Sequence, residues 1–284
     1  MIRIVEVGPR DGLQSETRSI PTESKVAYID ALSAAGLPEI EASAFVSPKW
    51  IPQLADADEV FRRIRRVPGV IYSALVPNEQ GLERAMSAKA DKISVFTAAS
   101  ETFNRRNINA SIEESIQRFV PVIDRARRSA LPIRGYVSTA FWCPYEGRIE
   151  PSKTLEVCLR LIDVGVDEIS IGDTIGKAVP EEVRRLLEDV LPRIPAERLA
   201  LHFHDTYHHA VENLIASWKL GIEAFDSSAG GIGGCPYAPG ASGNVATEAV
   251  VEALRAAGAE VRVDLAAIGE ARRILLPVLG RPTA

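Results

Sequence analysis

The sequence has few of the residues that build disulfide frameworks or structural zinc sites. Its 284 residues include only three cysteines, an odd number without Cys-x-x-Cys spacing. A disulfide framework is therefore excluded, and a reducing compartment fits best. The chain also opens without the cationic and apolar regions of a secretory leader, so we expect a cytoplasmic protein.

Excess positive charge and long apolar runs are also missing. The 38 acidic side chains outnumber the 33 basic ones, which gives a net charge of −5 and no electrostatic footprint of a general nucleic-acid binder. No stretch approaches the roughly 18 consecutive apolar residues of a membrane helix. With 46% hydrophobic and 25% charged residues, the composition is that of a globular protein. We expect a small-molecule ligand, no nucleic acid and no membrane.

Short β-branched runs alternate with helical patterns along the whole chain. The helical patterns end at glycines, among them Gly36, Gly165, Gly221 and Gly258, and a strand follows within a few residues in most cases. Eight candidate strands lie at residues 3–7, 39–43, 70–75, 92–96, 133–138, 168–171, 199–203 and 224–226. Dividing 284 residues by eight gives about 35 per unit, the size of a βα repeat.

This pattern predicts an α/β fold with one domain over residues 1–284, a (β/α)₈ TIM barrel with a short C-terminal helical extension at about 264–284. A doubly wound sheet is disfavoured because no GxGxxG or Walker sequence follows the first strand. The last helix has the apolar spacing to pack against the barrel or a partner subunit.

In such a barrel, the functional groups lie where the strands end. The first strand leads into a turn that holds Arg10, Asp11 and Gln14, which taken alone fits a solvated turn with an ion pair. On the second strand, alternation points Glu41 into the barrel if Ile40 faces the helices. A buried carboxylate needs a cation, and Arg10 is the obvious partner; the alternative is that Glu41 lies at the rim.

The seventh strand carries the sharpest signal. His202 and His204 are two residues apart and so share one face of the strand, while Phe203 points to the other. This pair is typical of a metal chelate, and Asp11 or Asp173 at other strand ends could complete it. Such mixed ligation suits Mg²⁺, Mn²⁺ or Zn²⁺. His208 and His209, which begin the next helix, fit surface or substrate-rim positions better.

A glycine-rich segment follows the eighth strand. It has six glycines in the nineteen residues 226–244, with Cys235 among them. Three interpretations stay open: a flexible linker, an anion-binding loop, or a mobile lid that brings a reactive thiol to the substrate.

Seven segments together resemble one family, the 3-hydroxy-3-methylglutaryl-CoA (HMG-CoA) lyases, which belong to the metal-dependent lyase and synthase barrels. The likeness covers nearly the whole chain. The segments are VGPRDGLQ at 7–14, FVSPKW at 45–50, CPYEG at 143–147, GDTIG at 172–176, HFHDTY at 202–207, GGCPY at 233–237 and GNVATE at 243–248.

The resemblance implies a role for each matching residue. Arg10 is expected to stabilise an enolate, Glu41 to steady Arg10, and Cys235 to transfer a proton from the lid. It implies an acyl-CoA substrate, a divalent cation that is Mg²⁺ or Mn²⁺, and a homodimer. The implied metal ligands are Asp11, His202, His204 and Asn244; the catalytic residues Arg10, Asp11, Glu41, Asp173, His202 and Cys235; the substrate-binding residues Arg10, Gln14, Gly233 and Gly234.

The activity implied is a retro-Claisen cleavage of HMG-CoA to acetyl-CoA and acetoacetate, the chemistry of leucine degradation and ketone bodies. Phe141 and Trp142 stand where relatives often have small residues, so they are expected to reshape the acyl pocket. A bulkier 3-hydroxy-3-alkylglutaryl-CoA is an alternative substrate. His208 and His209 replace a common Gly-Gln pair. A condensing isopropylmalate or homocitrate synthase is an alternative, but those relatives carry large C-terminal regions and only about 40 residues follow Asn244 here. A non-catalytic metal-binding barrel is a further alternative.

Overall fold

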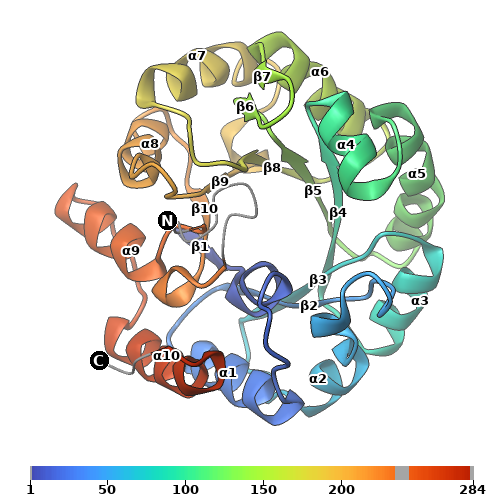
Figure 1. Ribbon diagram of the computed structural model, residues 1–284. Helices are drawn as coiled ribbons and strands as arrows, with labels where there is room; N and C mark the ends of the chain where they lie inside the picture. The colour runs from blue at the N-terminus through green and yellow to red at the C-terminus, as the bar shows by residue number, and fades with distance from the viewer. Residues whose placement is uncertain (1, 234–242, 282–284) are drawn as a thin grey trace.

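The computed structural model describes residues 2–233 and 243–281. Eight parallel strands close into a barrel in the order β1-β10-β9-β8-β5-β4-β3-β2, and helices form a ring around it (Figure 1). The predicted TIM barrel and its eight strands are confirmed. The barrel strands are β1 (Arg3–Glu6), β2 (Glu39–Ala44), β3 (Ile71–Leu75), β4 (Lys92–Ala98), β5 (Ile133–Ser138), β8 (Glu168–Asp173), β9 (Leu199–Phe203) and β10 (Ala224–Ser227).

The helices follow the strands as the βα repeat requires. They are α1 (Thr22–Ala34), α2 (Ala57–Arg63), α3 (Glu79–Ser87), α4 (Glu101–Ile108), α5 (Ile112–Arg128), α6 (Pro151–Asp163), α7 (Pro180–Val190), α8 (Ala210–Trp218), α9 (Thr247–Ala256) and α10 (Leu265–Leu279). The helix α10 is the predicted extension, and it packs on α1 of the same chain (Figure 1). Within the described residues, every helix is too short or too polar to cross a bilayer.

Local sequence explains where several of these elements begin. Ser111 caps α5 in a capping box with Glu114, which satisfies two backbone N–H groups at the helix start. Two elements have no counterpart in the repeat pattern: the extra helix α4, and a small hairpin of β6 (Trp142–Cys143) and β7 (Gly147–Arg148) after β5.

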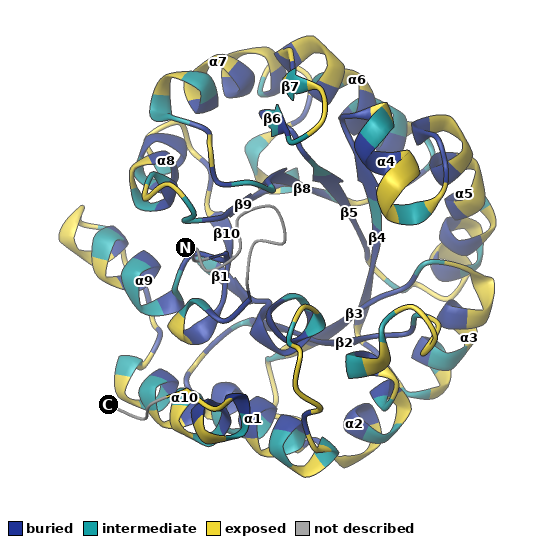
Figure 2. Cartoon of the chain, viewed as in Figure 1, coloured by how far each residue is buried: buried dark blue, intermediate teal, exposed yellow. Residues whose placement is uncertain are grey.

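Apolar side chains fill the layer between the strands and the helices. The strands are buried almost throughout, whereas exposed residues lie on the outer faces of the helices (Figure 2). Ile4, Ile40 and Phe225 on the strands join this layer together with Ile29 and Leu254 on the helices. Because burial of apolar area is the main stabilising term in folding, this layer holds the barrel together.

The barrel interior carries charges at its amino-terminal end. Arg3, Glu39, Lys92 and Glu168 form a closed ring of alternating charge, in which Arg3 and Lys92 each contact both carboxylates at 2.9–3.0 Å. Arg134 extends the ring, since its guanidinium bonds both Glu168 and Asp226. Each charge taken out of water is compensated by opposite charges, which is the condition for burying it.

Removing one member should leave its partners buried without compensation. We expect Lys92→Met to lower the free energy of unfolding by about 3–5 kcal/mol, because Glu39 and Glu168 both lose the buried cation that lies between them. Urea unfolding followed by circular dichroism measures the change. Arg273→Met, which breaks an exposed ion pair with Glu270, should leave the stability nearly unchanged. A loss below about 1 kcal/mol for Lys92→Met would contradict the stabilising role of the ring.

Candidate metal centre and substrate pocket

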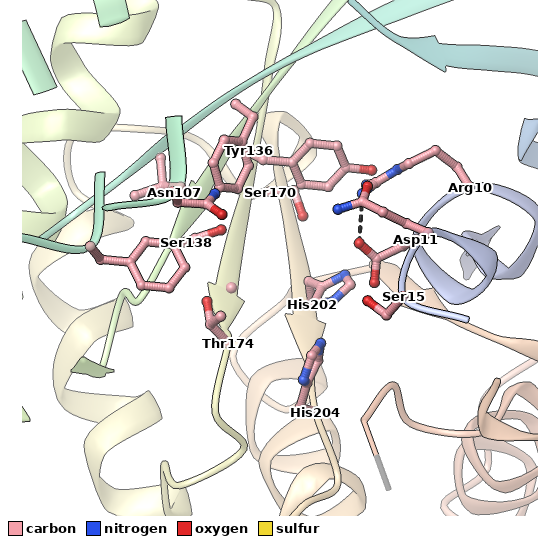
Figure 3. A pocket seen from close by; sticks show the side chains of 15 residues that line it. Arg10, Asp11, Ser15, Asn107, Tyr136, Ser138, Ser170, Thr174, His202 and His204 are labelled. Atoms are coloured by element: carbon pink, nitrogen blue, oxygen red, sulfur yellow. Dashed lines mark hydrogen bonds and ion pairs between the residues drawn. The ribbon is translucent and has the colours of Figure 1, made fainter. Parts of the chain in front are cut away.

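A pocket opens at the carboxyl ends of the strands (Figure 3). Four of the residues that line it come from the turn after β1 and the residues that follow. The others come from β4, α4, β5, β8 and β9 and from the residues just after β8 and β9. The functional groups that line it include Arg10, Asp11, Gln14, Ser15, Asn107, Tyr136, Ser138, Ser170, Thr174, His202 and His204.

The turn after β1 places Arg10 and Asp11 at the pocket wall. Residues Gly8–Gly12 form a single π-helical turn, in which three successive N–H groups, those of Arg10, Asp11 and Gly12, point to the carbonyl of Val7. Arg10 donates from Nη1 to Asp11 at 2.5 Å (Figure 3) and from Nε to Glu41 at 2.5 Å. The predicted partnership of Arg10 and Glu41 is confirmed, and the rim position for Glu41 is wrong, because that side chain is buried.

Glu41 lies behind Arg10 and does not line the pocket. Its carboxylate also accepts hydrogen bonds from Ser94 Oγ at 2.5 Å and from the Tyr136 hydroxyl at 3.1 Å. The Tyr136 ring in turn lies under the Arg10 guanidinium, 5.2 Å from centroid to Cζ. Glu41 and Tyr136 thereby hold Arg10 from two sides, and Glu41 is connected to the pocket through Arg10.

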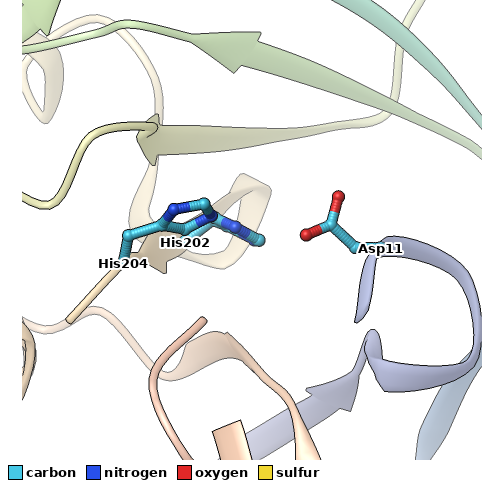
Figure 4. A group of neighbouring side chains, drawn as sticks. All are labelled: Asp11, His202 and His204. Carbon is cyan, nitrogen blue, oxygen red and sulfur yellow. The ribbon is translucent and has the colours of Figure 1, made fainter. Parts of the chain in front are cut away.

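Asp11, His202 and His204 come together at the pocket floor (Figure 4). One ligand atom from each residue lies within 4.8 Å of the other two. The two histidine rings lie side by side, with centroids 5.3 Å apart, and face the carboxylate of Asp11 across a gap (Figure 4). The alternation predicted for β9 therefore holds, and Asp11, not Asp173, is the carboxylate in this group.

Asp226 orients His202. Its Oδ2 lies 3.3 Å from His202 Nδ1, which leaves Nε2 of that ring for a metal ion. Asp226 also accepts from Ser170 Oγ at 2.8 Å and from Arg134 Nη1 at 2.6 Å. Burial raises the pKa of Asp226, but Arg134 and His202 outweigh this and hold it below its ordinary value. Burial lowers the pKa of His202, but Asp226 and Asp11 outweigh this and raise it above its ordinary value.

Asn244 reaches the same group from the far end of the chain. Its Nδ2 donates to Asp11 Oδ2 at 2.9 Å and to the carbonyl of Ile232 at 3.2 Å. Within residues 2–233 and 243–281, its buried Oδ1 has no hydrogen-bond partner, and neither has Nδ1 of His204. Buried polar atoms usually have partners, so both atoms are candidates for ligands.

The chemistry of these donors fits a divalent cation. Burial lowers the pKa of His204 to about 4, so its imidazole is neutral and keeps a free lone pair. Burial raises the pKa of Asp11, but Arg10 and the histidines bring it down to about 2, so the carboxylate is ionised. Imidazole nitrogens with carboxylate and amide oxygens are ligands that suit Mg²⁺, Mn²⁺ or Zn²⁺.

The surrounding charges favour a cation as well. The ion pairs that run through the barrel and up to the pocket contain five carboxylates and four basic groups. The carboxylates belong to Asp11, Glu39, Glu41, Glu168 and Asp226, and the cations to Arg3, Arg10, Lys92 and Arg134. With His202, which pairs with Asp226, in its neutral form, one negative charge is left over, and a cation among Asp11, His202 and His204 offsets it.

The structure does not bring Asp173 to the pocket. Its carboxylate accepts the backbone N–H groups of Lys177 at 3.2 Å and Ala178 at 2.9 Å, so it shapes the segment between β8 and α7. Burial raises its pKa to about 7 in spite of these bonds. The neighbouring Gly172 and Thr174 line the pocket instead.

The glycine-rich segment is described only in part. Gly234 and Cys235 lie outside the described residues. Gly233 has φ +113°, and a Cβ there would approach Asn244 Nδ2 to 2.7 Å, so only glycine leaves this amide in place. Gln14 lines the pocket, as its predicted substrate role requires.

The expectation that Phe141 and Trp142 reshape the pocket is wrong. The hairpin of β6 and β7 turns both away from it. Phe141 packs on Phe203 in the layer outside the barrel, and Trp142 donates to Glu182 and lies under Lys177. The apolar part of the pocket wall is made by Phe96, Phe103 and Val137.

The other singled-out histidines and cysteines lie apart from the metal group. His208 is 83% exposed, with φ +63°, and its Nδ1 lies 3.6 Å from Asp205; His209 lies 3.6 Å from Glu212. Cys158 is a core residue, and burial raises its pKa to about 12. Cys143 is buried, with its Sγ 3.0 Å from Ser100 Oγ.

A closed parallel barrel whose strand ends supply two histidines, an ionised aspartate and an arginine defines the class: a TIM barrel with a candidate site for a divalent cation at the carboxyl ends of its strands. A family model described as HMGL-like matches residues 1–275. The chain belongs to this family, that of the HMG-CoA lyases.

Individual relatives agree with this assignment. A zebrafish (Danio rerio) protein named 3-hydroxy-3-methylglutaryl-CoA lyase, cytoplasmic, is 49% identical over 282 residues, which is 99% of this chain and 84% of that protein. A Pseudomonas aeruginosa protein named 3-hydroxy-3-isohexenylglutaryl-CoA/hydroxy-methylglutaryl-CoA lyase is 49% identical over 280 residues, 99% of this chain and 93% of its own.

Solved structures of HMG-CoA lyases superpose closely on this chain. The enzyme of Brucella melitensis has a TM-score of 0.96 at 49% identity, and covers 98% of this chain and 99% of its own. An HMG-CoA lyase from Acinetobacter baumannii, in complex with coenzyme A and 3-methylmalate, has a TM-score of 0.93 at 38% identity, with 99% and 92% covered.

The contact of Asp226 with His202 generates a first prediction. Asp226→Asn should weaken Mn²⁺ binding about 10- to 100-fold, because the neutral amide fixes the His202 ring less firmly. Titration of Mn²⁺ followed by electron paramagnetic resonance measures the affinity. Asp56→Asn is the matched control: Asp226→Asn takes a carboxylate from the buried Arg134, and Asp56→Asn takes one from the buried Lys25, away from the pocket. Wild-type affinity in Asp226→Asn would contradict the orienting role.

A second prediction concerns the effect of Asp173 on the pH dependence of the free energy of unfolding. Its pKa rises from 3.8 to about 7 on folding, so the folded protein holds a proton that the unfolded chain releases between these values. Its contribution to stability therefore falls as pH rises through this window, at no more than about 1.4 kcal/mol per pH unit. Asp173→Asn should flatten the slope of the free energy of unfolding between pH 5 and 7.

Urea unfolding at pH 5, 6, 7 and 8 measures this slope. Glu6, whose pKa burial also raises to about 7, contributes with the same sign, so the slope should decrease without vanishing. Asp124→Asn, on the exposed face of α5, is the control and should leave it unchanged. An equal slope in Asp173→Asn and wild type counts against burial of an uncompensated carboxyl group at this position.

Proposed function

We propose that this protein is an HMG-CoA lyase that cleaves HMG-CoA to acetyl-CoA and acetoacetate. The observation that carries the proposal is the group of Asp11, His202 and His204 beside the Arg10 guanidinium, in a chain 49% identical to proteins with that name. The complex of the Acinetobacter relative with coenzyme A supports an acyl-CoA substrate.

Arg10 is suited to hold the negative charge that develops on the thioester oxygen. When the bond between C2 and C3 breaks, the electron pair passes to the acetyl-CoA part as an enolate. Arg10 is charged, because Glu41 and Asp11 raise its pKa although burial lowers it. It is fixed before the substrate arrives by Glu41 and Tyr136, and such preorganised charge lowers the barrier most.

The chain must also take one proton from the tertiary hydroxyl and return one to C2. A divalent cation, held by Asp11, His202, His204 and Asn244, supplies positive charge that favours loss of the hydroxyl proton. Asp11 and His202 are the pocket groups proposed for the acid and base work. With the cation on Nε2 of His202 and Asp226 beside Nδ1, that ring has no free lone pair, so it would accept a proton only when Nε2 leaves the cation. The role of Cys235 as the acid for C2 stays a prediction.

The acyl group has two candidates. The Pseudomonas relative bears the names of two activities, on the methyl and on the isohexenyl substrate. In this chain Phe96 and Phe103 form the apolar part of the wall, and Phe96 is only half-buried. We propose the methyl compound as the principal substrate and place the bulkier 3-hydroxy-3-alkylglutaryl-CoA second.

The cation, the assembly and the compartment are proposals of a different kind. The proposed donor set favours Mg²⁺ or Mn²⁺ over Zn²⁺, because the oxygens of Asp11 and Asn244 balance the two histidine nitrogens and the set includes no cysteine. A homodimer and a cytoplasmic location stay predictions.

The decisive experiment is a cleavage assay on HMG-CoA after removal of metal ions with EDTA. We expect acetyl-CoA and acetoacetate in equal amounts when Mg²⁺ or Mn²⁺ is restored, and activity reduced at least 100-fold without them. Coupling to citrate synthase measures acetyl-CoA, and acetoacetate is measured separately.

The same assay separates the alternatives. Comparison of kcat/KM for the methyl and isohexenyl thioesters gives the acyl preference. Incubation with acetyl-CoA and a 2-oxo acid tests for a condensing synthase. Condensation faster than cleavage would overturn the proposal, and so would metal binding without turnover of any of these CoA esters.

A further inference from the structure

Glu6, the last residue of β1, is a buried carboxylate that points away from the barrel interior. One oxygen accepts the N–H groups of Gly8 at 3.0 Å and Ala229 at 2.9 Å, and the other accepts the Thr247 hydroxyl at 2.7 Å. Its side chain is completely buried, and within the described parts of the chain no lysine or arginine forms an ion pair with it. All its compensation comes from these three hydrogen bonds.

The three bonds lead to the segments that carry two of the proposed metal ligands. Gly8 begins the turn that holds Asp11, and Thr247 lies three residues after Asn244 at the start of α9. Ala229 begins η4 (Ala229–Gly231), and the next residue, Ile232, accepts a hydrogen bond from the Asn244 amide. Residues 6 and 247 are 241 positions apart, so Glu6 links the first strand to the start of α9, late in the sequence.

The segments are packed too closely to move independently. A Cβ at Gly8 would lie 2.5 Å from Glu6 Oε1, and one at Gly12 would lie 2.8 Å from the carbonyl of Ile232. Where these segments meet, Asn244 donates to Asp11 at 2.9 Å. A shift of either segment therefore changes the distance between these two side chains.

We propose that Glu6 is a positioning residue for the metal centre: its carboxylate holds the turn of residues 8–12 against residues 229–232 and 244–247, and so sets Asp11 and Asn244 at the spacing a divalent cation needs. The inference rests on the proposed function, because it presumes that these two side chains bind the cation.

The same geometry implies that Glu6 acts by hydrogen bonding and not by charge. In Glu6→Gln, the amide oxygen still accepts from Gly8 and Ala229, and the amide N–H donates to Thr247 Oγ1. Thr247 accommodates the exchange, because its hydroxyl also lies 2.8 Å from Ser227 Oγ and turns its proton there. Burial, which raises the pKa of Glu6 to about 7, makes the neutral form tolerable as well.

The test measures Mn²⁺ affinity by electron paramagnetic resonance alongside thermal unfolding and kcat. Wild type is titrated first; if it does not bind Mn²⁺, the proposed metal centre fails, whatever Glu6 does. We expect Glu6→Ala to bind Mn²⁺ at least 10-fold more weakly and to lose kcat, whereas Glu6→Gln should stay within about threefold of wild type in both.

Tyr72→Phe is the control for a purely structural loss. The buried Tyr72 hydroxyl, at the start of β3 and far from the pocket, bonds Val67 N–H at 2.9 Å and Ser33 Oγ at 2.9 Å. It should lower the melting temperature and leave the Mn²⁺ affinity unchanged. The proposal is overturned if Glu6→Ala binds Mn²⁺ as wild type does, or if Glu6→Gln is as impaired as Glu6→Ala.

If Glu6→Ala does not fold, Thr247→Val decides. It removes one of the three links, together with the bond between Thr247 and Ser227, and keeps the bonds of Glu6 to Gly8 and Ala229. We expect Mn²⁺ binding two- to fivefold weaker than in wild type. An unchanged affinity in this variant would then overturn the proposal.

Discussion

The compensation of charge inside the barrel is the constraint on which the rest of the structure depends. In TIM barrels the interior is usually filled by branched apolar side chains. Here the amino-terminal end of the interior holds the ring of Arg3, Glu39, Lys92 and Glu168. Arg134 links this ring to Asp226, which in turn contacts His202. Ion pairs therefore connect His202 in the pocket, through Asp226 and Arg134, to the ring at the amino-terminal end of the barrel.

Much of this architecture could be predicted from the sequence, because the signals are local. The recurrence of helix, glycine and strand gave all eight strands to within two residues at each end. The spacing of His202 and His204 predicted that both side chains point to the same side. The need to compensate the buried charge of Glu41 predicted its contact with Arg10. One local signal is misleading: threonine commonly caps helices, yet Thr22 is the first helical residue of α1 and its hydroxyl donates to Asp56.

What could not be predicted depends on contacts between distant segments. Asp226 meets Arg134 across 92 residues, and nothing near either residue signals the other. Tyr136 is buried at the pocket wall between Arg10 and Arg134, and nothing in its own strand signals the contact with Arg10. Phe141 and Trp142 were misplaced because the small hairpin after β5 reverses the chain. Asp173 is on the face opposite Glu168 and Ser170, which the alternation along β8 explains once Glu168 is known to point inward.

The order of the proposed ligands along the chain has a consequence for biosynthesis. Asp11 belongs to the first βα unit, whereas His202, His204 and Asn244 belong to the last two. A nascent chain on the ribosome displays Asp11 long before its partners are made, and β1 gains its neighbour β10 only near the end of translation. All four side chains are therefore present together only after the last two units have been made, and a chain truncated before the last unit lacks Asn244.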